Sequence, residues 1–326
     1  MCAHLNDSVG DSIIVALAFD SGYTMSAAVT LRSVAENVQG PVTAYILDVG
    51  LRTEDKQKIE ESIPNRSLDI TLLYIDLPPN SLALNVGPSW AKIDMMKCVP
   101  AERVIYLDAD TLVRKDLREL WNTDLNGHSI AAAPDIVPDI WRPMGDQHVP
   151  QGPYFNSGVL LLDLVKIRPT LPKLEALCYE IRDPPCGDRD PLNIHFGGDW
   201  ALLSLTWNAQ GTGSMVKWPD PVGQKLPLDQ LDDPAIIHFS GPLHPSMVNV
   251  LAPYLQPFVA KPWGYAGAPG HPHAKDWWDM LEKTVWKGWR ETREYKEMCD
   301  QTRMKMLKSG LEAFNKRLEG MKGIDY

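Results

Sequence analysis

Two aspartates two residues apart, Asp108 and Asp110, are the side chains whose spacing most directly suggests chemistry. They follow the apolar run 104–107, which has the composition of a buried β-strand. In an extended segment, residues i and i+2 point to the same side, so the two carboxylates can converge at the strand's carboxyl end. Open α/β sheets bind ligands at that end, and paired carboxylates suit Mg²⁺ or Mn²⁺ carrying a phosphate. The same tripeptide pattern recurs at 188–190, so it does not identify a metal site by itself.

The elements that must position these carboxylates follow a strand–helix–strand order. Apolar runs predict strands at 13–19, 42–49, 70–75, 104–107, 129–133, 154–163 and 235–239. Helical periodicity predicts helices at 25–34, 53–63, 89–98, 117–121 and 171–181. This alternation predicts an α/β fold with a Rossmann-like sheet in its first half.

Composition excludes several classes of protein. A net charge of −10 argues against a nucleic-acid partner. The five cysteines are scattered, without the paired spacing of a zinc site or the density of a disulfide framework. The apolar run 13–19 is too short for a membrane span and lacks the basic flank of a signal peptide, so we expect a cytoplasmic protein.

Three further stretches place polar residues beside predicted strands. They are Tyr-Phe-Asn-Ser-Gly at 154–158, Asp-Arg-Asp-Pro-Leu-Asn at 188–193 with Trp-Asn at 207–208, and Ile-Ile-His-Phe-Ser-Gly at 236–241. Together with the stretch 103–113, and in this order, they resemble the retaining family-8 glycosyltransferases. That family has the GT-A fold, a Rossmann-like mixed sheet flanked by helices, and uses nucleotide sugars. It is similar to bacterial lipopolysaccharide galactosyl- and glucosyltransferases, glycogenin and galactinol synthase. The resemblance covers about residues 13–263.

The resemblance implies a metal site and its ligands. Asp108, Asp110 and His238 match the family residues that bind a divalent cation bridging the diphosphate of a UDP-sugar. One imidazole beside two carboxylates favours Mn²⁺, with Mg²⁺ as the second candidate. Ala109 and Gly241, from the same two motifs, complete the expected cofactor-binding set.

The resemblance also assigns the nucleotide. Asp20 matches the aspartate that hydrogen-bonds uracil, and Tyr23 matches the aromatic residue that stacks on it. Lys92 stands where the family has an arginine, and should meet the diphosphate or the sugar. The family's diphosphate lysine has two candidates: Lys261, displaced by an insertion at 242–260, is preferred to His244, which stands at the family position.

Around the donor sugar, Asp135, Asn156 and Asp188 match residues that hydrogen-bond hexose hydroxyls. Arg189 replaces the family glutamine beneath the anomeric carbon, where a charged guanidinium without an acceptor cannot be a nucleophile. Arg189 can also point away and pair with Asp188 or Asp190. A second alignment places the stretch 197–203 on the motif instead. The Pro- and Gly-rich stretch 138–153 fits either a substrate wall or a surface loop.

The implied function is a Mn²⁺-dependent retaining glycosyltransferase that moves a hexose from UDP-glucose or UDP-galactose to an acceptor hydroxyl with an α-linkage. A glycan, a polyol or a small molecule would each supply that hydroxyl. The altered residues Lys92, Arg189 and His244 motivate an alternative, a UDP-sugar-binding protein with impaired catalysis. A metal-dependent phosphohydrolase is a third interpretation of the aspartate pair.

The chain is expected to divide into a catalytic domain at 1–263 and a linker with a helical extension at 264–326. Aromatic residues between Trp277 and Trp289 predict one helix, and apolar residues from Met304 to Met321 repeat at steps of three and four. Docking on the catalytic domain, homodimer formation and peripheral membrane contact are three alternatives for this extension.

Overall fold

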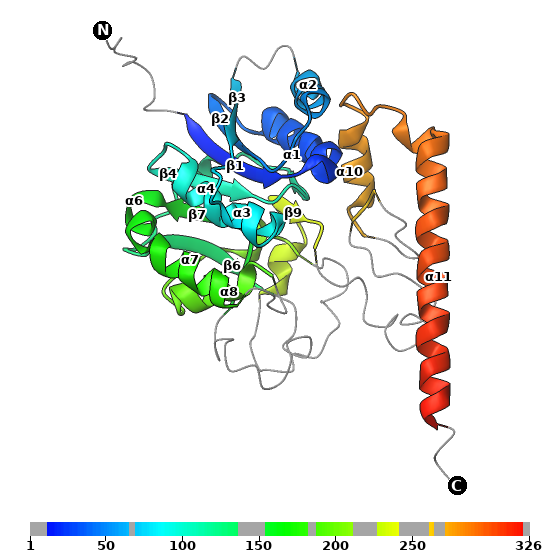
Figure 1. Ribbon diagram of the computed structural model, residues 1–326. Helices are drawn as coiled ribbons and strands as arrows, with labels where there is room; N and C mark the ends of the chain where they lie inside the picture. Colours follow the sequence, from blue (N-terminus) through cyan, green and yellow to red (C-terminus); the bar gives the residue numbers. More distant parts are fainter. Residues whose placement is uncertain are drawn as a thin grey trace.

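The centre of the fold is a seven-stranded mixed sheet. The structure, a computed structural model, describes residues 12–64, 69–135, 154–181, 187–210, 227–240, 261–263 and 271–321. The strand order is β3-β2-β1-β4-β7-β6-β8. Strands β1 to β4 are parallel, β7 is antiparallel to both β4 and β6, and β8 is parallel to β6. Helices lie on both sides of the sheet (Figure 1), as the strand–helix alternation predicts.

The bounds of the elements agree closely with the sequence periodicity. The strands are β1 (Ile13–Phe19), β2 (Val42–Asp48), β3 (Ile70–Asp76), β4 (Arg103–Leu107), β5 (Thr111–Val113), β6 (Ile130–Pro134), β7 (Phe155–Asp163), β8 (Ala201–Leu202) and β9 (Ile236–His238). The α-helices are α1 (Thr24–Asn37), α2 (Thr53–Ser62), α3 (Leu82–Asn85), α4 (Ala91–Cys98), α5 (Arg118–Trp121), α6 (Leu164–Ile167), α7 (Leu171–Glu180), α8 (Arg189–Phe196), α10 (Ala274–Leu281) and α11 (Arg293–Met321). Strands β5 and β8 and helices α3, α6 and α8 were not predicted. Helix α8 carries the second Asp-x-Asp pattern at its start.

Two apolar layers hold the sheet between its helices. In β1, Val15 and Leu17 pack into the cluster that includes α1 and α2, whereas Ala16 packs into the cluster that includes α4, α7 and α8. Alternate residues of a strand point to opposite faces, so a continuous apolar run is required where both faces are covered. Figure 1 shows these two helical layers on either side of the sheet.

A two-stranded ribbon forms where β5 pairs antiparallel with β9. It brings residues 236–238 to the aspartate loop, which is the segment 108–110 that carries the two aspartates. In its register Thr111 lies opposite His238. Asp110 immediately precedes this pair, and its carbonyl accepts a hydrogen bond from the Phe239 amide at 3.0 Å. Residues 127 and 129 positions apart in the sequence are therefore neighbours in space.

The polar side of α1 holds the same loop. Ser26 and Thr30 donate hydrogen bonds to the carbonyl of Ala109, at 2.5 and 3.1 Å, and the Thr30 hydroxyl also lies 2.7 Å from the carbonyl of Thr111. The Ser33 hydroxyl accepts a hydrogen bond from the amide of the last β5 residue at 2.9 Å. Backbone groups that lack a strand partner need such donors and acceptors when they are buried.

The C-terminal extension differs from its prediction. The aromatic residues from Trp277 to Trp289 do not share one helix, because α10 ends at Leu281 and Trp289 lies in a separate 3₁₀ turn. Gly288, directly before that turn, has a φ of 75°, a left-handed conformation that glycine adopts readily.

The two helices of the extension have different surroundings. Helix α10 packs against α1, β5 and β9, which corresponds to the docking alternative. Helix α11 leaves Met304 65% and Leu311 53% exposed, so the homodimer and membrane alternatives stay predictions. Within the described residues, no helix combines the length and the hydrophobicity that crossing a bilayer requires.

Candidate functional site

Asp108, Asp110 and His238 lie together where β4 ends and β9 pairs with β5. The Nε2 atom of His238 is 3.3 Å from Oδ1 of Asp110 and 3.6 Å from Oδ2 of Asp108. One ligand atom from each residue fits within 4.8 Å of the others. Ligands of one cation at bond lengths of about 2.1 Å lie at most about 4 Å apart, so these spacings fit a divalent metal after small adjustments. The fold thus brings together the three side chains that the sequence analysis predicts as metal ligands, in an arrangement that could hold a cation.

A chain of buried amides fixes the orientation of the His238 ring. The backbone amide of Gly158 donates to Oδ1 of Asn156 at 2.9 Å, which identifies that atom as the oxygen. Asn208 must therefore present its Nδ2 to Asn156 at 3.0 Å, and its Oδ1 to Nδ1 of His238 at 3.0 Å. Nδ1 then carries the hydrogen, and the lone pair of Nε2 faces the two aspartates.

Burial also keeps this imidazole neutral. His238 is 3% exposed. Burial, with the positive charges of Lys92 and Arg189, lowers the pKa of His238 to about 4, although Asp108 acts in the opposite direction. A neutral imidazole is the form that binds metals.

Gly158 leaves the space that this ring occupies. A Cβ atom at position 158 would lie 2.1 Å from Cε1 and 2.5 Å from Nδ1 of His238. Both are far below van der Waals contact, so any side chain at 158 must displace the imidazole. The glycine of the Asn-Ser-Gly sequence in β7 is therefore needed to leave room for the imidazole of a predicted metal ligand.

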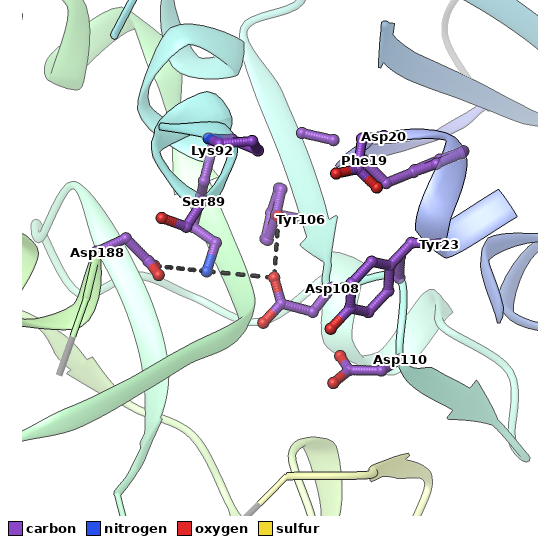
Figure 2. Close-up of a pocket in the computed structure, with 12 residues that line it drawn as sticks. Phe19, Asp20, Tyr23, Ser89, Lys92, Tyr106, Asp108, Asp110 and Asp188 are labelled. Carbon is purple, nitrogen blue, oxygen red and sulfur yellow. Dashed lines mark hydrogen bonds and ion pairs between the residues drawn. The ribbon is translucent and has the colours of Figure 1, made fainter. Parts of the chain in front are cut away.

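Lys92 joins the metal site to the predicted sugar site. Its ammonium lies 3.2 Å from Asp108 and 2.8 Å from Asp188 (Figure 2). The ammonium also donates a hydrogen bond to the Ser157 hydroxyl at 3.0 Å. Burial would lower the pKa of Lys92, but the two carboxylates outweigh it and raise the pKa. Burial likewise opposes ionisation of Asp108, yet Lys92, His238 and the hydroxyl of Tyr106 at 2.9 Å lower its pKa. Both groups are therefore charged at neutral pH.

A cavity of about 240 Å³ opens beside this network. Figure 2 shows Asp20 and Tyr23 on one side of it, Lys92 and Asp188 on the other, and Asp108 between them. Seven residues singled out from the sequence line it: Asp20, Tyr23, Lys92, Asp108, Ala109, Asp110 and Asp188. Asp199, the carboxylate of the second alignment, instead pairs with His128 and has a side chain that is 76% exposed.

The structure pairs Arg189 with Asp135, a partner that the sequence analysis did not name. Its guanidinium lies 2.5 Å from the carboxylate of Asp135, whose side chain is 2% exposed. Asp190 is buried and accepts a hydrogen bond from the Tyr154 hydroxyl at 2.7 Å. Arg189 and Asp190 are consecutive residues of α8, and neighbours in a helix point in directions about 100° apart. Their side chains can therefore have different partners.

The remaining predicted residues differ in their placement. Asn156 is 2% exposed, and its carboxamide oxygen is occupied by Gly158 and Asn208. Lys261 makes an ion pair with Asp110, and burial lowers the pKa of Lys261 to about 8. Gly241, His244 and the loop at 138–153 lie outside the described residues.

Sequence reasoning missed the supporting residues. Ser157 and Tyr106 contact Lys92 and Asp108, and Asn208 orients His238, yet each was noticed only as part of a motif. Tyr106 stands two residues before Asp108, so strand alternation would have placed both on one face. No local pattern links Asn208 to Asn156 or to His238, because the three residues come from segments far apart in the sequence.

Comparison with known proteins agrees with this geometry. Residues 14–245 match the family model described as glycosyl transferase family 8. General stress protein A of Bacillus subtilis is 28% identical over 229 residues, which cover 65% of this chain and 79% of that protein. The lipopolysaccharide 1,2-glucosyltransferase of Escherichia coli K12 is 25% identical over 254 residues, 74% of each chain. Glycosyltransferase GlyF of Streptococcus pneumoniae is 27% identical, over 69% of this chain and 55% of that protein.

Solved structures show the same fold. The galactosyltransferase LgtC, crystallised with donor and acceptor sugar analogs, superposes with a TM-score of 0.64 at 21% identity, covering 85% of this chain and 99% of its own. The bifunctional glycosyltransferase WbbM superposes with a TM-score of 0.66 at 18% identity, covering 87% of this chain and 52% of its own. The mixed sheet with flanking helices is thus the GT-A architecture. Since the family model matches most of the sequence, the chain belongs to glycosyl transferase family 8.

Proposed function

We propose that this glycosyltransferase is a Mn²⁺-dependent, retaining hexosyltransferase that transfers glucose or galactose from a UDP-sugar to an acceptor hydroxyl, forming an α-linkage. The observation that carries the proposal is the cluster of Asp108, Asp110 and His238 at the edge of the cavity that Asp20 and Tyr23 also line. The cavity offers a place for a base at one end and for a diphosphate and sugar at the other.

The base end of the cavity suits uracil. The Asp20 carboxylate lines it, and a carboxylate accepts a hydrogen bond from uracil N3–H, a hydrogen that cytosine lacks. Tyr23 is 41% exposed, so its ring has free surface on which a base can stack. Neighbouring carboxylates and burial raise the pKa of Tyr23, which keeps the phenol neutral.

The donor set suits Mn²⁺, because an imidazole nitrogen beside two carboxylates is softer than the all-oxygen set that Mg²⁺ prefers. The bound cation would stabilise the negative charge that develops on the departing UDP. In this chain Asp108, Asp110 and His238 would hold it, and Lys261, paired with Asp110, lies where an ammonium can also face the diphosphate.

The sugar end favours a displacement on one face of the hexose. The bond between the anomeric carbon and the diphosphate breaks, the acceptor oxygen attacks from the same side, and its proton passes to a diphosphate oxygen. A double displacement would need a carboxylate nucleophile such as Asp188. That carboxylate already accepts hydrogen bonds from Lys92 and Ser157, both at 2.8 Å, which makes it a weaker nucleophile. Arg189, held by Asp135, offers no acceptor atom.

The test is release of UDP from a panel of UDP-sugars, with Mn²⁺, Mg²⁺ or EDTA, in wild-type protein and three variants. We expect release from UDP-glucose or UDP-galactose with Mn²⁺, and its loss with EDTA or in Asp110→Asn. Asp188→Asn should lose release as well, whereas Asp199→Asn should keep it, because Asp199 lies on the exposed surface.

Two outcomes would contradict the proposal. Tight UDP binding without release from any donor, in the presence of candidate acceptors, would support a binding protein with impaired catalysis. Hydrolysis of UDP itself would support a metal-dependent phosphohydrolase. Transfer that is indifferent to Asp188→Asn but lost in Asp199→Asn would favour the second alignment.

A further inference from the structure

The C-terminal extension is anchored on the helix that also holds the aspartate loop. Trp277, in α10, is fully buried in a cluster that includes Val29 of α1. After α10, the carbonyl of Lys283 accepts a hydrogen bond from Arg32 at 2.7 Å, and its ammonium pairs with Glu36. Figure 1 shows α10 lying along α1, whereas α11 extends away. The first part of the extension is thus fixed to the catalytic fold by both apolar and charged contacts.

Trp277 is the base of a row of aromatic rings that reaches the cavity. Its ring centroid lies 5.1 Å from that of Trp263, with the planes tilted by 36°. Trp263 in turn lies 6.2 Å from Tyr23, with the two rings nearly perpendicular at 83°. Tyr23 lines the cavity beside Asp108 and Asp110 (Figure 2). Edge-to-face and offset contacts at these separations are favourable and directional, so each ring restricts the next.

The same tryptophan supports the metal site from a second direction. Ile237 and Phe239, the two neighbours of His238 in the sequence, pack into the cluster of Trp277. The ammonium of Lys261, which pairs with Asp110, lies 6.0 Å from the ring centroid of Trp263. A displacement of Trp277 would therefore affect the ring under the base and the cation near the diphosphate together.

We propose that Trp277 is a positioning residue for a nucleoside diphosphate: it supports Trp263, and through Trp263 it holds Tyr23 and Lys261 in place for the ligand. This inference rests on the proposed function, because it requires that the cavity bind UDP. It gives the extension, which lies beyond the segment matched by the family model, a direct part in forming the site.

The experiment measures UDP affinity by calorimetry, in full-length protein with saturating Mn²⁺. Trp277→Leu keeps a buried apolar side chain but removes the ring, and Trp289→Leu is the matched control in the same extension. Trp289 contacts Trp278 and Tyr295 and not Trp263. We expect the UDP Kd to rise about tenfold in Trp277→Leu and to change by less than about twofold in Trp289→Leu.

A double-mutant cycle separates positioning from a general loss of stability. If Trp277 acts through Trp263, then Trp263→Leu with Trp277→Leu should weaken UDP no more than Trp263→Leu alone. Donor KM should rise more than kcat falls, because Tyr23 and Lys261 would contact the nucleotide and not the sugar. Trp277→Phe, which restores an aromatic ring, should recover most of the affinity. Trp277→Met, a second apolar side chain without a ring, replaces the leucine variant if that variant does not fold.

Each outcome decides the matter. An unchanged UDP Kd in a folded Trp277→Leu or Trp277→Met protein, or additive losses in the double mutant, would overturn the inference and leave the proposed function intact. Equal losses in Trp277→Leu and Trp289→Leu would also overturn it, because the effect would then belong to the stability of the extension. Wild-type protein that binds no UDP would refute the proposed function, and this inference with it.

Discussion

Replacing Gly158 by alanine tests the proposed metal site without mutating any of its three predicted ligands. The added Cβ would lie 2.1 Å from Cε1 of His238, 2.5 Å from Nδ1 and 2.9 Å from Nε2. Gly158 is the fourth of the nine residues of β7, and its carbonyl accepts a hydrogen bond from the Asp108 amide, so the backbone cannot easily move away. The imidazole must retreat instead, and with it the nitrogen that faces Asp108 and Asp110.

The size of the effect follows from these distances. The ring must withdraw by about 1 Å before the shortest contact becomes tolerable, and a misplacement of that size commonly costs about 100-fold in function. We therefore expect Mn²⁺ to bind Gly158→Ala about 100-fold more weakly than the wild type, or about 2.8 kcal/mol. Overpacking should also lower the free energy of unfolding by about 1–3 kcal/mol.

The assay is titration with Mn²⁺, followed by the paramagnetic resonance signal of the free ion, beside urea unfolding. His238→Ala provides the control, because it removes the ring with which the new Cβ collides. In that background Gly158→Ala should change the free energy of unfolding much less than it does in the wild type. A folded Gly158→Ala protein with wild-type Mn²⁺ affinity would refute the reasoning.

Three further predictions follow from single contacts. Asn208→Leu removes the acceptor that orients the ligand imidazole, so Mn²⁺ affinity should fall about 10- to 100-fold by calorimetry, and an unchanged affinity would show that the ring needs no such partner. The Arg52 guanidinium lowers the pKa of Asp55 to about 2, so their pairing stabilises the fold fully above about pH 4 and is lost as the pH falls towards 2. Because Arg52 is 68% exposed, Asp55→Asn should lower the free energy of unfolding by only about 1 kcal/mol at pH 7 and by almost nothing near pH 2. Urea unfolding of both proteins across this range measures the difference, and a difference that does not shrink towards pH 2 would contradict the prediction. Arg189→Gln removes the ion pair of the buried Asp135 carboxylate and should lower the free energy of unfolding by about 3 kcal/mol. A variant as stable as the wild type would show that this ion pair does not contribute to stability.

The parts that the sequence predicts well are those set by local patterns. The first strand at 13–19 and the strand before Asp108 have the predicted bounds to within a residue, because buried parallel strands need continuous apolar runs. Asp108 and Asp110 could be placed at a strand end from spacing alone. His238 joined them through the resemblance to the family, and the antiparallel register of β5 with β9 is what brings it there.

The parts that the sequence predicts poorly depend on contacts between distant segments. Ser26 and Thr30 interrupt the apolar pattern of α1, and only the fold shows that they hold the carbonyl of Ala109. The pairing of Arg189 with Asp135 depends on how α8 is rotated against the end of β6. The contact of Trp277 with Trp263 joins an extension to a motif whose spacing departs from the family's.

The most direct test of the account is a crystal structure with UDP and Mn²⁺, in which anomalous scattering locates the metal. The account predicts an anomalous peak within about 2.3 Å of Nε2 of His238 and of an oxygen from each of Asp108 and Asp110. It also predicts uracil between Asp20 and Tyr23. UDP bound in the cavity with no peak at these three residues, or a metal held elsewhere in the chain, would contradict the central claim.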